Sequence, residues 1–181
     1  MLLRRCCEEA GAPSSKLRGG RHGSSELRGL RSDDTRPSDI TWLDFFGPSG
    51  KHLLIDTTVA TLYRKYMLAS GRFNTPGLAA REAENEKFKK DGASSLPTTL
   101  GPHRLVPFAI EESGRFGRHA IALLRELASR GVTDGFLKPP SSWLSAKRPQ
   151  IISYWVDRWL QDISATLALH LASIVVNQIG A

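Results

Sequence analysis

Two aspartates, Asp39 and Asp56, have the residue type and spacing of a metal-binding pair in this 181-residue chain. They lie in residues 39–45 and 51–59, two segments rich in β-branched, aromatic and aliphatic residues. A Gly-Pro-Ser-Gly sequence between the segments suits a tight turn, so the pattern predicts a β-hairpin. Divalent cations such as Mg²⁺ prefer carboxylate oxygens as ligands, which makes the hairpin a candidate metal site.

The turn determines which hairpin residues are expected to face one another. With the Pro-Ser dipeptide at its centre, Asp39 lies opposite Thr58. The same count places Thr41 opposite Asp56. Side chains alternate between faces along a strand, so all four share one face, with the two carboxylates about 7–8 Å apart on a diagonal. A structural ion pair is the alternative role for Asp56, because a carboxylate that interrupts an apolar Leu-Leu-Ile run costs stability unless it is paired or metal-bound.

The segments that follow the hairpin predict the rest of a folded core. Residues 77–92 are rich in Ala and Glu and predict a helix, residues 103–112 predict a third strand, and residues 113–131 predict a turn and a second helix. The expected fold is α/β, with a small mixed sheet made of the hairpin and the third strand and flanked by helices. Lys87 either belongs to a solvated charged face of its helix or points toward the acidic end of the hairpin.

The composition changes along the chain and suggests four regions. Residues 1–35 are dominated by Gly, Ser and Arg and predict a disordered basic leader. Residues 36–131 form the α/β core, and residues 132–150 form a proline-rich linker. Residues 151–181 carry apolar residues at helical spacing and predict a long C-terminal amphipathic helix. If that helix does not fold back, its apolar stripe is a surface for a protein partner.

The overall charge favours polyanionic partners. The formal net charge is +7, which suits DNA or another nucleic acid. Cys6 and Cys7 are adjacent and are the only cysteines in the sequence, which excludes a disulfide framework or a zinc knuckle. No apolar run has the length of a membrane span, and the first residues lack the apolar core of a secretory signal. The expected location is therefore intracellular, in the nucleus or cytoplasm.

Two further features could contact nucleic acid. Arg115 and Arg118 lie in a Gly- and Arg-rich turn before the second helix, where a helix N-terminus could bind phosphate. The turn has neither the P-loop pattern nor the dinucleotide-binding pattern. Trp155 and Trp159 fall one turn apart on the last helix, where they serve either in packing or as a platform for base stacking.

The order of short motifs resembles a known family. RPSDI, LLIDTTV, AAREAENEKFKK and RLVPFAIEESGRFG, followed by an amphipathic helix, resemble the C-terminal region of reverse-transcriptase-related proteins of eukaryotic retroelements. That region is similar to restriction-endonuclease-like domains of the PD-(D/E)xK class. The resemblance implies a metal-dependent DNA endonuclease that hydrolyses phosphodiester bonds with Mg²⁺ or Mn²⁺.

The resemblance also implies roles for individual residues. Asp39 matches the first acid of the class and Asp56 the second, so both are implied metal ligands. Thr58 stands where the class has a lysine, and Lys87 from the following helix is the candidate to replace it. Glu111, at the end of the third strand, matches an acid of unassigned role. The class usually has a helix before the first acid, where this chain has only the Gly- and Arg-rich leader.

Two other functions remain open from the sequence. The chain could be a non-catalytic, basic nucleic-acid-binding remnant, in which Thr58 marks the loss of chemistry. It could also be a helix-mediated interaction protein that uses its C-terminal helix. A nuclease predicts that Asp39, Asp56 and Lys87 converge, whereas an interaction protein predicts an uncovered apolar stripe on the last helix. A decayed reading frame, whose product has no selected function, is a further possibility.

Overall fold

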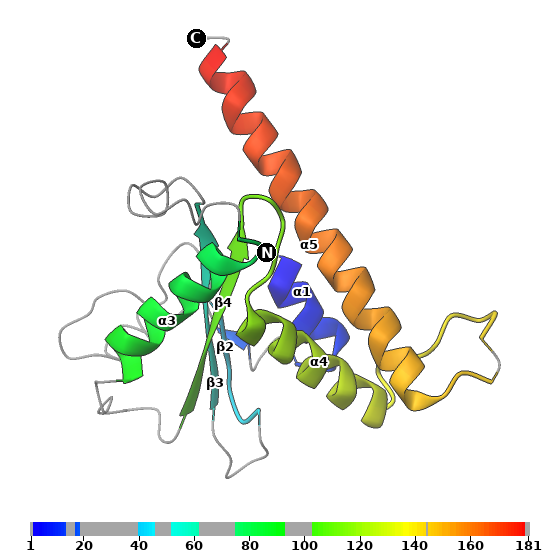
Figure 1. Ribbon diagram of the computed structural model, residues 1–181. Coiled ribbons are helices and arrows are strands. Elements are labelled where there is room, and N and C mark those ends of the chain that lie inside the picture. Colours follow the sequence, from blue (N-terminus) through cyan, green and yellow to red (C-terminus); the bar gives the residue numbers. More distant parts are fainter. Residues whose placement is uncertain are drawn as a thin grey trace.

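A computed structural model describes residues 2–13, 17–18, 40–45, 52–61, 75–92, 103–143 and 145–179. Within these residues the chain forms a mixed α/β structure with a small sheet and helices on both of its faces (Figure 1). The elements in chain order are α1 (Leu2–Glu9), β1 (Leu17–Arg18), β2 (Ile40–Trp42), β3 (His52–Ala60), α3 (Leu78–Gly92), β4 (His103–Glu111), α4 (Arg118–Thr133) and α5 (Arg148–Ile179).

The sheet has the strand order β1-β2-β3-β4. The β1–β2 and β2–β3 pairs are antiparallel, whereas β3 and β4 run parallel over nine residues. A parallel pair needs a crossover connection, and α3 lies in the connection between β3 and β4. The prediction of a small mixed sheet made of the hairpin and a third strand is therefore confirmed. Strand β1 adds only two residues to it.

The hairpin register differs from the one that the turn sequence predicts. Thr41 pairs with Leu54 and not with Asp56, a shift of two residues. A two-residue shift keeps every side chain on its original face, because the side-chain period of a strand is two. Thr41, Asp56 and Thr58 therefore still share a face.

Apolar pairing explains this register. Ile40 lies opposite Ile55, and Trp42 lies opposite Leu53, so these four core side chains are matched across the two strands. The expected register would have placed Ile40 opposite Thr57, an exposed residue. Burial of the apolar face therefore determines the hairpin register, and the assumed centre of the turn does not.

Different helices cover the two faces of the sheet. Helices α1, α4 and α5 contribute to the larger core, on the face that carries Leu53, Ile55 and Phe108. Helix α3 covers the opposite face, as the views of the ribbon show (Figure 1). The contact under α3 is built almost entirely of small side chains, namely Ala60, Leu78, Ala79, Ala80, Ala83 and Ala109. Small side chains let the backbone of α3 lie close to the sheet.

The first residues do not fit the expectation of an unstructured leader. Residues 2–9 form α1, and Leu3, Cys6 and Cys7 are buried in the larger core. The indole N–H of Trp159 on α5 donates a hydrogen bond to Glu9 Oε2 at 2.7 Å, which ties the two helices together. Burial raises the pKa of Cys7 to about 12, so its thiol stays protonated at neutral pH.

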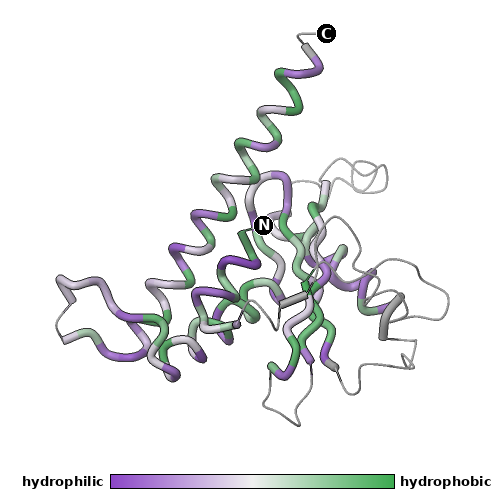
Figure 2. Tube along the Cα trace, turned by 180° about the vertical axis from the view of Figure 1, so that it is seen from behind, coloured by the Kyte–Doolittle hydropathy of each residue, from purple (hydrophilic) through white to green (hydrophobic). Residues whose placement is uncertain are grey.

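Helix α5 has two parts with different surroundings. It begins at Arg148, three residues before the predicted boundary, and runs for 32 residues. In its first half Val156 and Trp159 are buried in the core, whereas the second half extends away from the sheet and the other helices (Figures 1 and 2). By length and composition alone, residues 148–178 could cross a membrane, and 6% of their most apolar window is buried. Core helices of soluble proteins pass the same test.

Candidate functional site

Asp56 and Lys87 meet on the face of the sheet that α3 covers. Asp56 lies in the middle of β3 and Lys87 lies in the second half of α3. Their Oδ2 and Nζ atoms are 2.6 Å apart, and the side chains are 24% and 31% exposed, respectively. Lys87 therefore points toward Asp56 of the hairpin and is not part of a wholly solvated face. Asp56 forms an ion pair, which is the role that the sequence left open as the alternative to a metal site.

The sequence of α3 explains why Lys87 reaches the sheet. Ala80, Ala83, Glu84 and Lys87 recur at intervals of three and four residues, so they share one face of the helix. The two alanines are buried against the sheet and bring the helix close to it. The long lysine stem can then pass along this contact while its ammonium group reaches the partly exposed Asp56.

The other residues of the predicted metal site are placed less completely. Thr58 lies two residues beyond Asp56 on the same face and is partly exposed. The hydroxyl of Thr58 carries no charge. The positive charge beside Asp56 comes from Lys87. Asp39 lies outside the described residues. Within the described parts of the chain, no group of three or more His, Cys, Asp or Glu side chains is positioned to hold a metal ion.

Glu111 is fully buried, and its carboxylate binds the start of α3. Its Oε1 accepts hydrogen bonds from the backbone N–H groups of Ala79 at 3.0 Å and Ala80 at 3.5 Å. Its Oε2 accepts one from the Ser113 hydroxyl at 3.1 Å. Negative charge is favourable at a helix N-terminus, where the first N–H groups have no partner within the helix. The acid to which the family resemblance gave no role is therefore a helix cap in this structure.

Glu84 is a second buried carboxylate, and the sequence analysis did not single it out. Its Oε1 accepts hydrogen bonds from the backbone N–H groups of His119 at 3.0 Å and Ala120 at 3.1 Å, at the start of α4. Its Oε2 finds no hydrogen-bond partner among the described residues. A Cβ at Gly117 would overlap this carboxylate, so the glycine makes room for it. Two sequence signals point to Glu84: its place on the apolar face of α3, and a glycine directly before α4.

This cap changes the expected phosphate site at the same turn. The first amides of α4 already donate to Glu84, so they are engaged by a carboxylate of the chain itself. Arg115 and Arg118 are both exposed. Of the predicted phosphate site, the guanidinium groups of these two surface arginines are therefore the part that can still contact phosphate.

The tryptophans of α5 pack within the chain. Trp159 is fully buried, and the indole N–H of Trp155 donates to the backbone oxygen of Lys138 at 2.9 Å.

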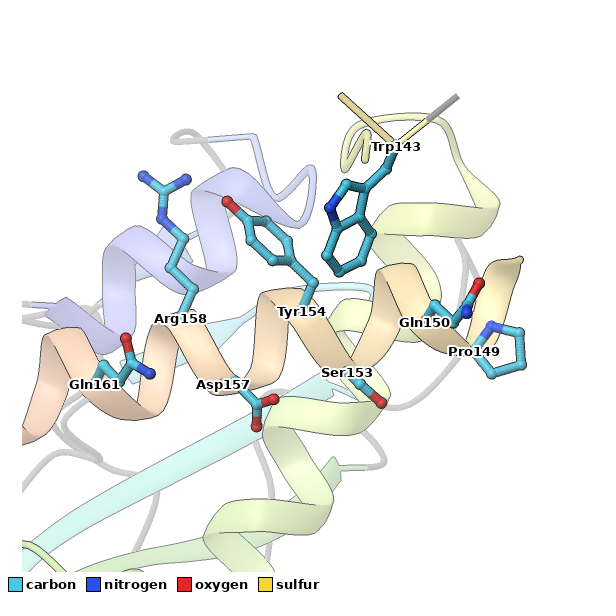
Figure 3. Close-up of a pocket in the computed structure, with 8 residues that line it drawn as sticks. All are labelled: Trp143, Pro149, Gln150, Ser153, Tyr154, Asp157, Arg158 and Gln161. Carbon is cyan, nitrogen blue, oxygen red and sulfur yellow. The ribbon is translucent and has the colours of Figure 1, made fainter. Parts of the chain in front are cut away.

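The more exposed aromatic residues are Trp143 and Tyr154, whose rings meet edge to face at 5.4 Å. They border a shallow surface pocket of about 560 Å³ (Figure 3). Its lining residues are Trp143, Pro149, Gln150, Ser153, Tyr154, Asp157, Arg158 and Gln161. Neither Asp56 nor Lys87 lines this pocket.

Comparisons with known proteins add no relative from which a function could be transferred. No family model matches the chain, and searches of curated proteins and of solved structures give no match. The site must therefore be interpreted from its own geometry.

Proposed function

We propose that the chain contains a metal-dependent DNA endonuclease-like domain of the PD-(D/E)xK class, derived from a retroelement. Asp39 and Asp56 would hold Mg²⁺ or Mn²⁺, and Lys87 would act beside them. The observation that carries the proposal is the 2.6 Å contact between Lys87 Nζ and Asp56 Oδ2. This contact supports the proposal because a lysine of the following helix lies beside Asp56, while Thr58 stands where the class would have a lysine on the strand.

The order of elements supports the same proposal. The class usually has a helix before its first acid, and α1 supplies a helix that the sequence analysis did not expect. Asp39 and Asp56 belong to the neighbouring segments 39–45 and 51–59, whose strands β2 and β3 form an antiparallel pair. Helix α3 then brings Lys87 back to β3 before the chain continues into the parallel strand β4.

The chemistry follows from charge and ligand type. Carboxylate oxygens such as those of Asp56 suit a hard divalent cation. When bound, such an ion supplies Lewis-acid stabilisation of a phosphate and lowers the pKa of a bound water. The ammonium group of Lys87, held in place by Asp56, can offset negative charge that develops on the phosphate. Arg115 and Arg118 are exposed and can contact the DNA backbone without reading its sequence.

Nicking of supercoiled plasmid tests the proposal. The full chain is incubated with plasmid in Mg²⁺ or Mn²⁺, beside the variants Asp56→Asn, Asp39→Asn and Lys87→Gln. Lys89→Gln is the matched control, because Lys89 lies on the same helix and is exposed. We expect nicking by the parent and the control, and a loss of about 100-fold in Lys87→Gln, the effect of removing one group that stabilises transition-state charge. Absence of nicking by a folded parent would overturn the proposal.

A second candidate function is DNA binding without cleavage. The replacement of the strand lysine by Thr58 favours it, together with the net charge of +7. Fluorescence anisotropy with labelled duplex DNA in EDTA measures binding separately from cleavage. Salt-dependent binding without nicking in either metal would select this second function.

A further inference from the structure

The last part of α5, residues 163–179, is unlike the rest of the described chain. We call it the α5 tail. It contains no Asp, Glu, Lys or Arg, and the last charged residue before it is Asp162. Figure 2 shows it extending away from the sheet and from the other helices. It is therefore a charge-free helical segment with little contact to the folded core.

The α5 tail exposes large apolar side chains. Leu169 is 73% exposed and Val176 is 67% exposed, and both Ile174 and Val175 are also exposed. Isolated apolar residues on a surface are ordinary, but four of them within eight residues form a patch that marks an interaction site. Water alone is an unfavourable environment for this segment.

The distribution around the helix indicates the kind of partner. Leu167, Leu171 and Ile174 continue the stripe that packs on the core in the first half of α5. Leu169 and Val176 lie roughly 160–180° around the helix from Leu167, given 3.6 residues per turn. A second helix that packed along the stripe would leave both of them in water. Polar residues form only a narrow stripe along the tail, namely Thr166, His170, Ser173 and Asn177, and apolar side chains cover most of the remaining surface. An apolar surface of that width is matched by a hydrocarbon environment.

Length and charge agree with a lipid partner. The 17 residues of the α5 tail span about 26 Å as a helix, close to the hydrocarbon thickness of about 30 Å. The rest of the chain carries the whole formal net charge of +7, which favours an anionic membrane surface.

We propose that the α5 tail inserts into a lipid bilayer and that the rest of the chain, which carries the net positive charge, stays at the membrane surface. The inference is independent of the nuclease proposal, because it rests on no residue of the Asp56–Lys87 site. It differs from the sequence-based expectation, which excluded a membrane and assigned this helix to a protein partner.

Vesicle flotation of the full chain tests this proposal. We expect the parent to float with neutral phosphatidylcholine vesicles and to remain bound in about 1 M NaCl, where the Debye length falls to about 3 Å. The test variant is Leu169→Lys/Val176→Lys. The control variant, Ser153→Lys/Gln161→Lys, adds the same charge at exposed positions in the first half of α5. Because lysine is among the costliest residues in hydrocarbon, we expect the test variant to bind at least about 100-fold more weakly than the control.

Three results would overturn the proposal. One is a parent that is folded by circular dichroism but does not float. Another is binding that requires anionic lipid and disappears in salt, which would assign the attachment to the positive charge of the rest of the chain alone. The third is concentration-dependent self-association without flotation, measured by analytical ultracentrifugation and lost in the test variant, which would make a second copy of the chain the partner of the α5 tail. Plasmid nicking by these variants is measured separately, so either proposal can fail alone.

Discussion

Replacing Gly117 by alanine should destabilise the protein only while Glu84 is present. The new Cβ would overlap the Glu84 carboxylate, which must then leave the start of α4. The backbone of Gly117 itself tolerates alanine, since its φ is −68° and its ψ is 162°. The cost of the substitution therefore arises from the lost cap and not from the backbone.

The size of the effect follows from the hydrogen bonds at the cap. Glu84 Oε1 accepts two backbone N–H groups, at 3.0 and 3.1 Å, from a buried position. A hydrogen bond to a charged group contributes about 1.5–3 kcal/mol net. Gly→Ala at a compatible position returns about 0.4–1 kcal/mol through the unfolded state. With both bonds lost and this return subtracted, we expect Gly117→Ala to lower the free energy of unfolding by roughly 2–5 kcal/mol.

A double-mutant cycle separates this mechanism from general crowding. In a Glu84→Ala background the carboxylate is absent, so Gly117→Ala should be neutral or stabilising by up to about 1 kcal/mol. Urea unfolding of the four proteins, followed by circular dichroism, gives a coupling free energy that we expect to be about 3–6 kcal/mol. Gly135→Ala is the control, because its φ of +78° makes alanine unfavourable at a site with no heavy atom within 4 Å. An equal cost of Gly117→Ala in both backgrounds would refute the reasoning.

Two further predictions concern the contacts of α1. Because burial raises the pKa of Cys7 from 9.0 to about 12, its protonated form stabilises the fold fully below pH 9, and this contribution is lost as the pH rises toward 12. Urea midpoints should therefore fall less between pH 8 and pH 10 in Cys7→Ala than in the parent, and an identical fall would contradict the assignment. Trp159→Phe removes the hydrogen bond to Glu9 Oε2 and should cost about 1.5–3 kcal/mol in thermal or urea unfolding. In a Glu9→Gln background the same change should cost less, and an unchanged cost would show that the lost contribution is packing.

The sequence carries enough information for the elements of the core but not for their tertiary contacts. The strong alternation and turn residues of the hairpin, and the Ala- and Glu-rich composition of α3, predict both elements correctly. The direction of Lys87 follows from its spacing from Ala80 and Ala83 on one helical face. These features depend on local periodicity, which a single sequence displays.

The features that the sequence analysis missed depend on distant partners. Helix α1 has only eight residues, and it is held by burial of Leu3, Cys6 and Cys7 against other elements. Glu111 and Glu84 accept hydrogen bonds from residues more than thirty positions away, so no local pattern announces their role. The hairpin register depends on cross-strand burial, which the turn sequence does not specify.

The two buried caps impose an order on how the chain can assemble. Helix α3 obtains the cap for its first amides from Glu111, which lies at the end of β4 and follows it in the chain. Helix α4 in turn obtains its cap from Glu84, which lies on α3. During synthesis α3 therefore emerges before the residue that completes its N-terminus, and it becomes fully capped only when β4 has been added to the sheet. The side of the sheet that carries Asp56 and Lys87 should thus form late, in one cooperative step with the start of α4.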